Sequence, residues 1–208
     1  MKLYLASYRV PTPDDLIKLV GKKPENIMVA HIPNAKDYYS ERARNFKINV
    51  VNTFLQDVGL KPEVVDLNEY KKDDLKEKLQ EFDLIWAAGG NTFCLREAMH
   101  KSGFDDILSE LLKSGVVYGG DSAGAIVVGP TLKGTETADE PEFSGNIIWE
   151  GIGVISEIII PHADNISLGP ALVPMLEMYK DDPNAIILND DQAYVVNGDK
   201  KVIVSSGE

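Results

Sequence analysis

The chain alternates short apolar runs with longer amphipathic stretches, a pattern typical of β-α-β units and a mainly parallel sheet. The first predicted strands are Lys2–Ser7, Ile27–Ile32, Val64–Leu67, Asp83–Ala88 and Val116–Tyr118. Further strand-like segments are Ile147–Trp149, Val154–Ile155, Ile158–Ile160, Ala185–Leu188, Ala193–Val196 and Lys201–Val204. No repeat, low-complexity tract or linker interrupts this pattern. We therefore expect an α/β fold in a single domain over residues 1–208.

Amphipathic stretches between the strands predict the helices. The longest is Tyr38–Val58, in which Phe46, Val50, Phe54 and Val58 recur four apart on one face. The other predicted helices are Asp73–Glu81, Phe93–Lys101, Phe104–Ser114, Ser122–Val128 and Leu168–Tyr179. The segment from Thr131 to Gly145 is polar and predicts a loop, and Asn197-Gly198 predicts a hairpin turn.

Composition narrows the function classes. A formal net charge of −12 over 208 residues disfavours nucleic acid and anionic membranes, because both require clustered Lys and Arg. Cys94 is the single cysteine, so no intramolecular disulfide is expected. No signal peptide and no run of roughly 20 apolar residues is evident. We expect a cytoplasmic protein with no metal or other cofactor.

The segment Gly120-Asp121-Ser122-Ala123-Gly124 matches the nucleophile-elbow pattern G-x-S-x-G. In that motif a serine lies on a tight turn between a strand and a helix, which exposes its hydroxyl above the sheet. The apolar run before Gly119 and the helix-compatible run after Ser122 provide this setting. The sequence therefore predicts that Ser122 is a nucleophile.

A second glycine turn, Gly89-Gly90-Asn91, also follows a buried strand and precedes a helix. In a parallel sheet both turns lie at the carboxyl edge, where ligands bind. We expect the N–H groups of Gly90 and Ala123 to form an oxyanion hole. Asn91 or Thr92 is expected to cap the following helix, and both residues are expected to contact substrate.

A serine nucleophile needs a base, and the chain has three histidines. His162 follows the apolar run Ile158–Ile160 at a strand end, which is the best position for a base. His31 is the second candidate, and His100 fits an exposed helix position.

The base in turn needs a carboxylate to orient it, and spacing alone does not choose one. The candidates between serine and histidine are Glu136, Asp139, Glu140 and Glu142, and those beyond the histidine are Asp164, Asp190 and Asp191.

Three segments together resemble one family of serine peptidases, the dipeptidase E and cyanophycinase family. They are Ala88-Gly89-Gly90-Asn91-Thr92-Phe93, Gly120-Asp121-Ser122-Ala123-Gly124-Ala125 and Ile160-Pro161-His162-Ala163-Asp164-Asn165. Their order and approximate spacing match the family over most of the chain. The resemblance implies a class I glutamine amidotransferase-like (flavodoxin-like) fold, a three-layer α/β/α sandwich.

The resemblance also implies roles for individual residues. Ser122 would be the nucleophile, His162 the base, and Asp139 in Ala138-Asp139-Glu140-Pro141 the third member of the triad. Relatives that use an acidic residue near the closing strands would place Asp190 or Asp191 there. The expected function is hydrolysis of small peptides through an acyl-enzyme.

Specificity is where the sequence departs from an aspartyl dipeptidase. An arginine would suit a substrate carboxylate, but the last arginine is Arg96, and the segment Leu168–Met175 after His162 is apolar. We therefore expect a small-peptide substrate without strict aspartyl specificity. The alternatives are a serine esterase or other hydrolase acting on a non-peptide substrate, and a non-catalytic amidotransferase-like binding domain. A glutamine amidotransferase would need cysteine at the elbow.

Overall fold

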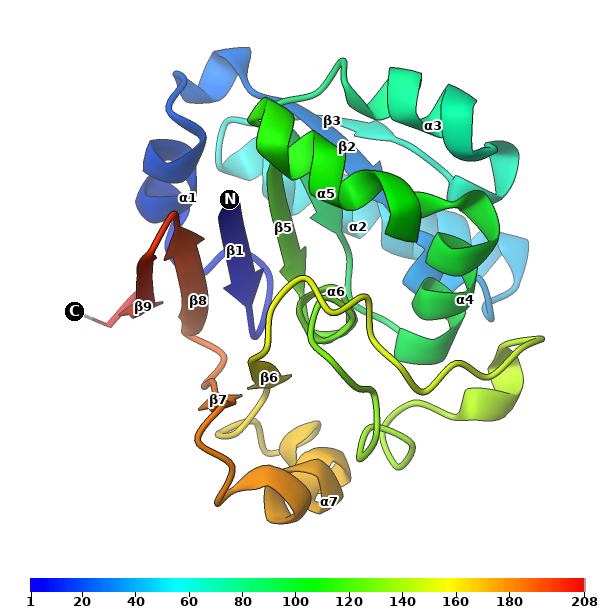
Figure 1. Ribbon diagram of the computed structural model, residues 1–208, viewed down its shortest axis with the longest axis vertical. Coiled ribbons are helices and arrows are strands. Elements are labelled where there is room, and N and C mark those ends of the chain that lie inside the picture. The colour runs from blue at the N-terminus through cyan, green and yellow to red at the C-terminus, as the bar shows by residue number, and fades with distance from the viewer. Residues whose placement is uncertain (208) are drawn as a thin grey trace.

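The computed structural model describes residues 1–207 and centres on a seven-stranded sheet with the order β3-β2-β4-β5-β1-β8-β9 (Figure 1). Its strands are β1 (Lys2–Ala6), β2 (Met28–Ile32), β3 (Lys61–Val64), β4 (Leu84–Ala87), β5 (Val117–Asp121), β8 (Gln192–Asn197) and β9 (Lys200–Ser205). A separate parallel pair is formed by β6 (Ile158–Ile160) and β7 (Ala185–Ile187).

The first five strands are parallel, and β8 and β9 extend the sheet in antiparallel pairings. In the β1–β5 register Ala6 pairs with Asp121, so the chain leaves both strands at the same edge. Because β8 runs opposite to β1, Ala6 also pairs with Ala193 near the start of β8. This pairing brings the segment before β8 to the edge where β1 and β5 end.

Helices cover both faces of the sheet, and each face has its own apolar core (Figure 1). One face packs against α3 (Lys72–Leu79), α4 (Thr92–Ser102) and α5 (Phe104–Ser114). The other face packs against α1 (Pro13–Val20) and α2 (Glu41–Asp57). The short α6 (Ala123–Ile126) follows β5, and α7 (Gly169–Tyr179) packs on β6 in a third, smaller cluster. The three layers agree with the predicted α/β/α sandwich.

The predicted elements agree with most of the observed ones, with the following differences. Helix α1 was not predicted, although Pro13 begins it and Gly21 ends it in a left-handed conformation. Strand β3 lies at Lys61–Val64, earlier than the predicted Val64–Leu67. The predicted strand-like segments Ile147–Trp149 and Val154–Ile155 contain no extended strand and contribute only irregular connections.

The apolar stripe predicted on the long helix is the most informative difference. Helix α2 packs on the sheet through Ile48, Val51 and Leu55. Phe46 and Val50 belong to the predicted stripe, but they are 69% and 39% exposed. Phe54 and Val58 of the stripe pack partly against the core, so only Phe46 and Val50 lie outside it and need another explanation. No helix within residues 1–207 is both long and apolar enough to span a bilayer.

Candidate active site

Ser122 occupies the turn between β5 and α6 with φ 51° and ψ −114°, a conformation that few side chains adopt. Its N–H donates to the carbonyl of Ala6 (3.1 Å), which fixes the turn to the end of β1. A Cβ on Gly124 would lie 1.9 Å from the carbonyl oxygen of Ala87, and one on Gly120 would lie 2.7 Å from the Gly124 backbone. Both glycines of the pattern are thus required for close backbone packing.

His162 follows β6 and also has a positive φ, 62°. Its N–H donates to the hydroxyl oxygen of Ser7 (2.7 Å), just beyond the end of β1. Its Nε2 lies 2.9 Å from Ser122 Oγ, within hydrogen-bonding distance, and the residue is 3% exposed. The structure therefore brings together the two residues that the sequence paired as nucleophile and base.

The carboxylate beside His162 belongs to Asp190, which precedes β8. Its Oδ1 lies 2.6 Å from His162 Nδ1 and accepts a hydrogen bond from Ser7 Oγ (3.0 Å), while Oδ2 accepts one from Asn165 Nδ2 (2.5 Å). Partial burial acts to raise the pKa of Asp190, but the hydrogen bonds from Asn165, His162 and Ser7 together hold that pKa below its usual value. An ionised carboxylate in this position favours the imidazole tautomer that carries its proton on Nδ1.

Asp139 does not orient the imidazole, and the expectation that it would is corrected by this geometry. Its Oδ2 accepts hydrogen bonds from the backbone N–H (3.0 Å) and the hydroxyl of Thr92, at the first turn of α4. Burial is the main reason that the pKa of Asp139 is raised, although the Thr92 hydrogen bonds oppose it. Asp139 therefore fastens the loop after α6 to α4. Asp191, the other alternative, accepts a hydrogen bond from Ser205 instead.

Gly89 and Gly90 form the second turn of the site, and their backbone is held from several sides. The Gly89 N–H donates to Asp121 Oδ1 (3.3 Å), its carbonyl accepts from the ammonium of Lys36, and the Asn91 N–H donates to the carbonyl of Ala35 (2.7 Å). The N–H groups of Gly90 and Ala123 donate to no acceptor within the described residues 1–207.

The side chains of Asn91 and Thr92 are engaged elsewhere and do not line the pocket at Ser122. Asn91 Oδ1 accepts from the N–H of Cys94 (3.0 Å), which makes it the predicted helix cap, and its Nδ2 donates to the Glu140 carbonyl (2.9 Å). Thr92 is fully buried against Asp139. This geometry does not support substrate contact through these two side chains, and the role of the two residues in binding stays a prediction.

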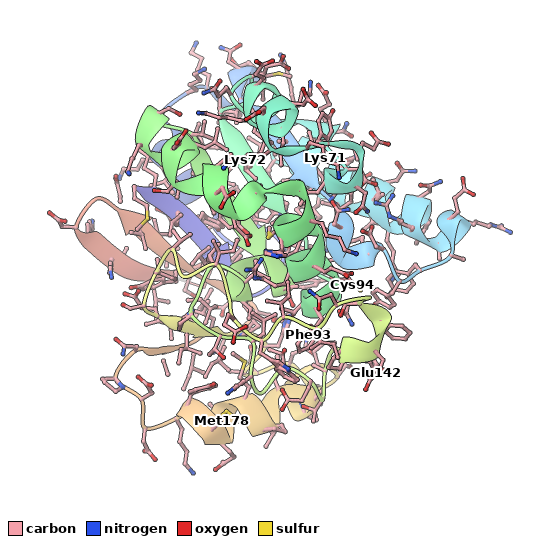
Figure 2. All side chains as sticks on the ribbon, turned by 45° about the vertical axis from the view of Figure 1, so that its right-hand side comes forward. Lys71, Lys72, Phe93, Cys94, Glu142 and Met178 are labelled. Carbon is pink, nitrogen blue, oxygen red and sulfur yellow. The ribbon has the colours of Figure 1, made fainter. Side chains whose placement is uncertain are left out.

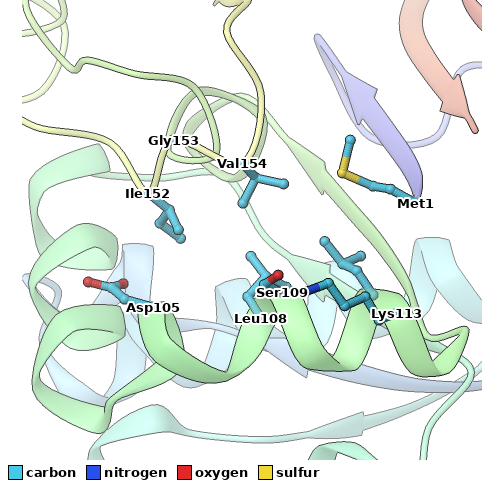
Figure 3. A pocket seen from close by; sticks show the side chains of 9 residues that line it. Met1, Asp105, Leu108, Ser109, Lys113, Ile152, Gly153 and Val154 are labelled. Atoms are coloured by element: carbon cyan, nitrogen blue, oxygen red, sulfur yellow. The ribbon is translucent and has the colours of Figure 1, made fainter. Parts of the chain in front are cut away.

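A pocket of about 390 Å³ opens over Ser122 and His162. One side is apolar and includes Ile126, Leu168 and Leu172, whereas the other carries Tyr8, Tyr39 and Lys47. A separate cavity of about 310 Å³ lies between α5 and the segment around Ile152–Val154 (Figure 3). That cavity contains no histidine, and its Asp105 is already bound to Arg96 by two hydrogen bonds, so we place no chemistry there.

The remaining candidates for chemistry lie outside the pocket. His31 is buried in β2 with Nδ1 2.8 Å from Asn52 Oδ1, and His100 is an exposed α4 residue beside Asp105. Cys94 lies with Phe93 in the first turn of α4, at the side of the molecule where Glu142 is labelled (Figure 2). Burial raises the pKa of its thiol to about 12. Within residues 1–207 no group of His, Cys, Asp or Glu is arranged to hold a metal ion.

A family model described as "Peptidase family S51" matches residues 6–204, which is nearly the whole chain. The protein belongs to peptidase family S51. This is a family of serine peptidases, and the protein is therefore a serine-type peptidase.

Relatives with known sequences and structures agree with this membership. An uncharacterized peptidase of Pasteurella multocida is 24% identical over 203 residues, covering 97% of this chain and 96% of its own. A peptidase E of Haemophilus influenzae is 28% identical, but the match covers 64% of this chain and half of that protein. The crystal structure of a putative peptidase E from Listeria monocytogenes superposes with a TM-score of 0.85 at 21% identity, covering 98% of both chains. This last match confirms the predicted class I glutamine amidotransferase-like fold.

Sequence reasoning on this S51 peptidase missed several residues that build the site. Ser7 contacts both His162 and Asp190 but belongs to no recognised pattern, and Asn165 contacts Asp190 but was given no role although it ends the His162 segment. The sequence could have indicated Ser7, because the predicted first strand ends there and this end lies at the same sheet edge as Ser122. Lys36 had no signal, since a lone lysine outside a motif is usually a solvated surface residue.

Proposed function

We propose that this S51 peptidase hydrolyses small peptides with Ser122 as nucleophile, His162 as general base and acid, and Asp190 as the residue that orients the imidazole. The observation that carries the proposal is the continuous hydrogen-bonded series from Asp190 through His162 to Ser122, with links of 2.6 and 2.9 Å. Such a series activates a hydroxyl that is otherwise a weak nucleophile.

In the proposed reaction Ser122 Oγ attacks the peptide carbonyl carbon while His162 Nε2 takes its proton. The carbonyl oxygen becomes an oxyanion, and the N–H groups of Gly90 and Ala123, which have no other acceptor within residues 1–207, are the proposed donors to it. His162 then gives its proton to the leaving nitrogen as the C–N bond breaks, which leaves an acyl-serine. Water, deprotonated by the same imidazole, attacks this ester and releases the acid and free Ser122.

A small substrate fits the pocket and its surroundings. A volume of about 390 Å³ accommodates a short peptide, and the loop held by Asp139 closes one side of the pocket. Aspartyl-dipeptide cleavage is one member of this substrate class. The apolar residues Leu168 and Leu172 at the pocket support a broader choice of peptide. The single cysteine supports the accompanying proposal of a cytoplasmic setting.

The test is hydrolysis of a dipeptide library and of simple esters by the purified protein and by Ser122→Ala. We expect peptide turnover that falls by about 10⁴-fold or more in Ser122→Ala, because the acyl-enzyme cannot form. Turnover of esters without peptides would favour the alternative esterase function. Peptide turnover that survives Ser122→Ala would exclude the proposed mechanism.

A further inference from the structure

A second pocket, of about 290 Å³, adjoins the one over Ser122 and shares Tyr8, Tyr39, Lys47, Gly89, Gly90 and Asp121 with it. Its outer wall is the exposed stripe of α2 formed by Phe46, Val50 and Phe54. Phe54 also packs partly against the core, but Phe46 and Val50 do not, and solvent exposure of Phe46 gives no stability. We call this the basic pocket, because its other wall is cationic.

Three cations line the basic pocket: Arg9, Lys36 and Lys47. Within residues 1–207, none of them forms an ion pair within 4 Å. Arg9 lies 4.9 Å from the ring centre of Tyr8, and Lys47 lies 4.6 Å from that of Tyr39. In a chain with a net charge of −12, three such cations next to a nucleophile form a local excess of positive charge.

Two features indicate that this charge is built into the fold. Lys36 is 6% exposed, and burial together with the neighbouring charge of Lys47 lowers its pKa to about 8, although Asp121 opposes this. Arg9 adopts a positive φ of 50°. Maintaining a buried lysine and a strained arginine costs stability, and such costs concentrate at functional sites.

The basic pocket also contains one acidic residue, Asp121. Its single negative charge does not cancel the positive charges of the three cations. Its carboxylate already accepts hydrogen bonds from Trp86 Nε1 (3.2 Å) and the Gly89 N–H (3.3 Å). These hydrogen bonds hold the Asp121 carboxylate against the Gly89 turn, and its charge also attracts Lys36, whose ammonium donates to the Gly89 carbonyl. The side chains of Arg9 and Lys47 remain available to a ligand.

We propose that the basic pocket binds the C-terminal residue of a peptide substrate, with the cations holding its carboxylate and the α2 stripe contacting an apolar side chain. This inference rests on the proposed peptidase function and specifies the substrate as a short peptide with a free, apolar C-terminal residue. Such a residue carries a negative carboxylate and an apolar side chain. The pocket offers cations to the carboxylate and the apolar residues of α2 to the side chain. The pocket adjoins Ser122, so only a very short leaving portion separates the carboxylate from the scissile bond.

The first experiment compares three peptides that share the best first residue X found in the library: X-Leu, X-Leu-amide and X-Asp-amide. We expect kcat/KM for X-Leu to exceed that for X-Leu-amide by about tenfold or more, the effect of one hydrogen bond to a charged group. Lys47→Gln and Arg9→Gln should each reduce this ratio. Arg42→Gln, which removes an exposed cation from the same helix, is the matched control and should preserve it.

A second variant addresses the apolar wall. Phe46→Ala removes an exposed ring, so the fold should be unaffected, but KM for X-Leu should rise more than KM for X-Gly. Ile166→Ala, which truncates another exposed apolar residue outside the basic pocket, should leave both values unchanged.

Two outcomes would overturn the inference. Equal kcat/KM for X-Leu and X-Leu-amide would show that the terminal carboxylate is not recognised, and preferential cleavage of X-Asp-amide would assign the cations to an acidic side chain instead. Failure of the peptidase proposal is separable by calorimetry on Ser122→Ala. Tighter binding of Ala-Leu than of Ala-Leu-amide there, lost in Ser122→Ala/Lys47→Gln, would support the basic pocket even without turnover.

Discussion

Three residues other than glycine have a positive φ within residues 1–207, namely Arg9, Ser122 and His162, and all three line the two adjoining pockets. Each conformation costs of order 1–3 kcal/mol and persists only because surrounding contacts enforce it. Ser122 and His162 are fixed through hydrogen bonds to Ala6 and Ser7 at the end of β1. At the scale of single residues, strain marks this site more clearly than any motif does.

The assignment of Asp190 makes a direct prediction about two carboxylates. Asp190→Asn should lower kcat by about 10⁴-fold, because an amide no longer favours the Nδ1-protonated imidazole or stabilises its charged form. Asp139→Asn should lower kcat less than tenfold and act mainly on stability, since it weakens the attachment of the loop to α4. Steady-state kinetics and thermal unfolding of both variants check this. A larger loss of kcat in Asp139→Asn than in Asp190→Asn would indicate that Asp139, and not Asp190, orients the imidazole.

Sequence reasoning reached two of the three members of this series. Ser122 and His162 were predictable because local patterns indicate a turn after a strand and a strand end before a loop. Asp190 was one of several open choices, because its place beside His162 depends on the antiparallel pairing of β8 with β1. That pairing joins segments nearly 190 residues apart and leaves no local pattern.

At the scale of elements, the turn after β4 must pass unusually close to the turn at Ala35. A Cβ on Gly90 would lie 2.3 Å from the Ala35 carbonyl oxygen, and Gly90 has φ 148°. We expect Gly90→Ala to displace the Gly90 N–H, the proposed oxyanion donor, and to lower kcat by about 10²–10³-fold.

The matched control for this prediction is Gly115→Ala. Gly115 also has a positive φ, 105°, but a Cβ there would meet no atom within 4 Å. This variant should lose some stability and keep its kcat. Equal kinetic losses in the two variants would mean that general strain, and not the oxyanion turn, is responsible.

Helix α2 illustrates what a periodic pattern does and does not predict. A four-residue repeat of apolar positions correctly predicts a helix, but it does not identify which face meets the core. Here the core face uses Ile48, Val51 and Leu55, whereas Phe46 and Val50 of the repeat face a pocket and Phe54 contacts both the pocket and the core. Only the packing of α2 against the sheet shows which residues of the helix belong to its core face.

At the scale of the whole molecule, His31 links global stability to pH. Burial, with smaller contributions from the charges of Lys36 and Arg44, lowers the pKa of His31 to about 3, although the hydrogen bond with Asn52 opposes this. In the unfolded chain the same group binds a proton below about pH 6.5. Acid therefore favours unfolding, and we expect the His31 contribution to fall by about 2 kcal/mol between about pH 7.5 and pH 5.

His31→Gln should remove this part of the pH dependence, because glutamine does not titrate and can still donate a hydrogen bond to Asn52. Urea unfolding at several pH values checks the prediction as the difference between the two proteins. His100→Gln is the matched control, because His100 is an exposed histidine on α4. If the free energy of unfolding changed with pH by the same amount in the wild type and in His31→Gln, His31 would not be the group responsible.

The overall architecture was predictable because alternating strands and helices leave few topologies open. The β1–β8 pairing and the layout of the two pockets were not, since they depend on contacts between distant segments.

The position of Ser7 has a consequence for the order in which this enzyme becomes active during synthesis. Ser7 is made early, whereas Asp190, the carboxylate that it contacts, emerges 183 residues later. A nascent chain that already contains Ser122 and His162 still lacks Asp190, the residue proposed to orient the imidazole. Under the proposed mechanism, full hydrolytic activity therefore awaits translation of the segment that carries Asp190, just before the closing strands β8 and β9.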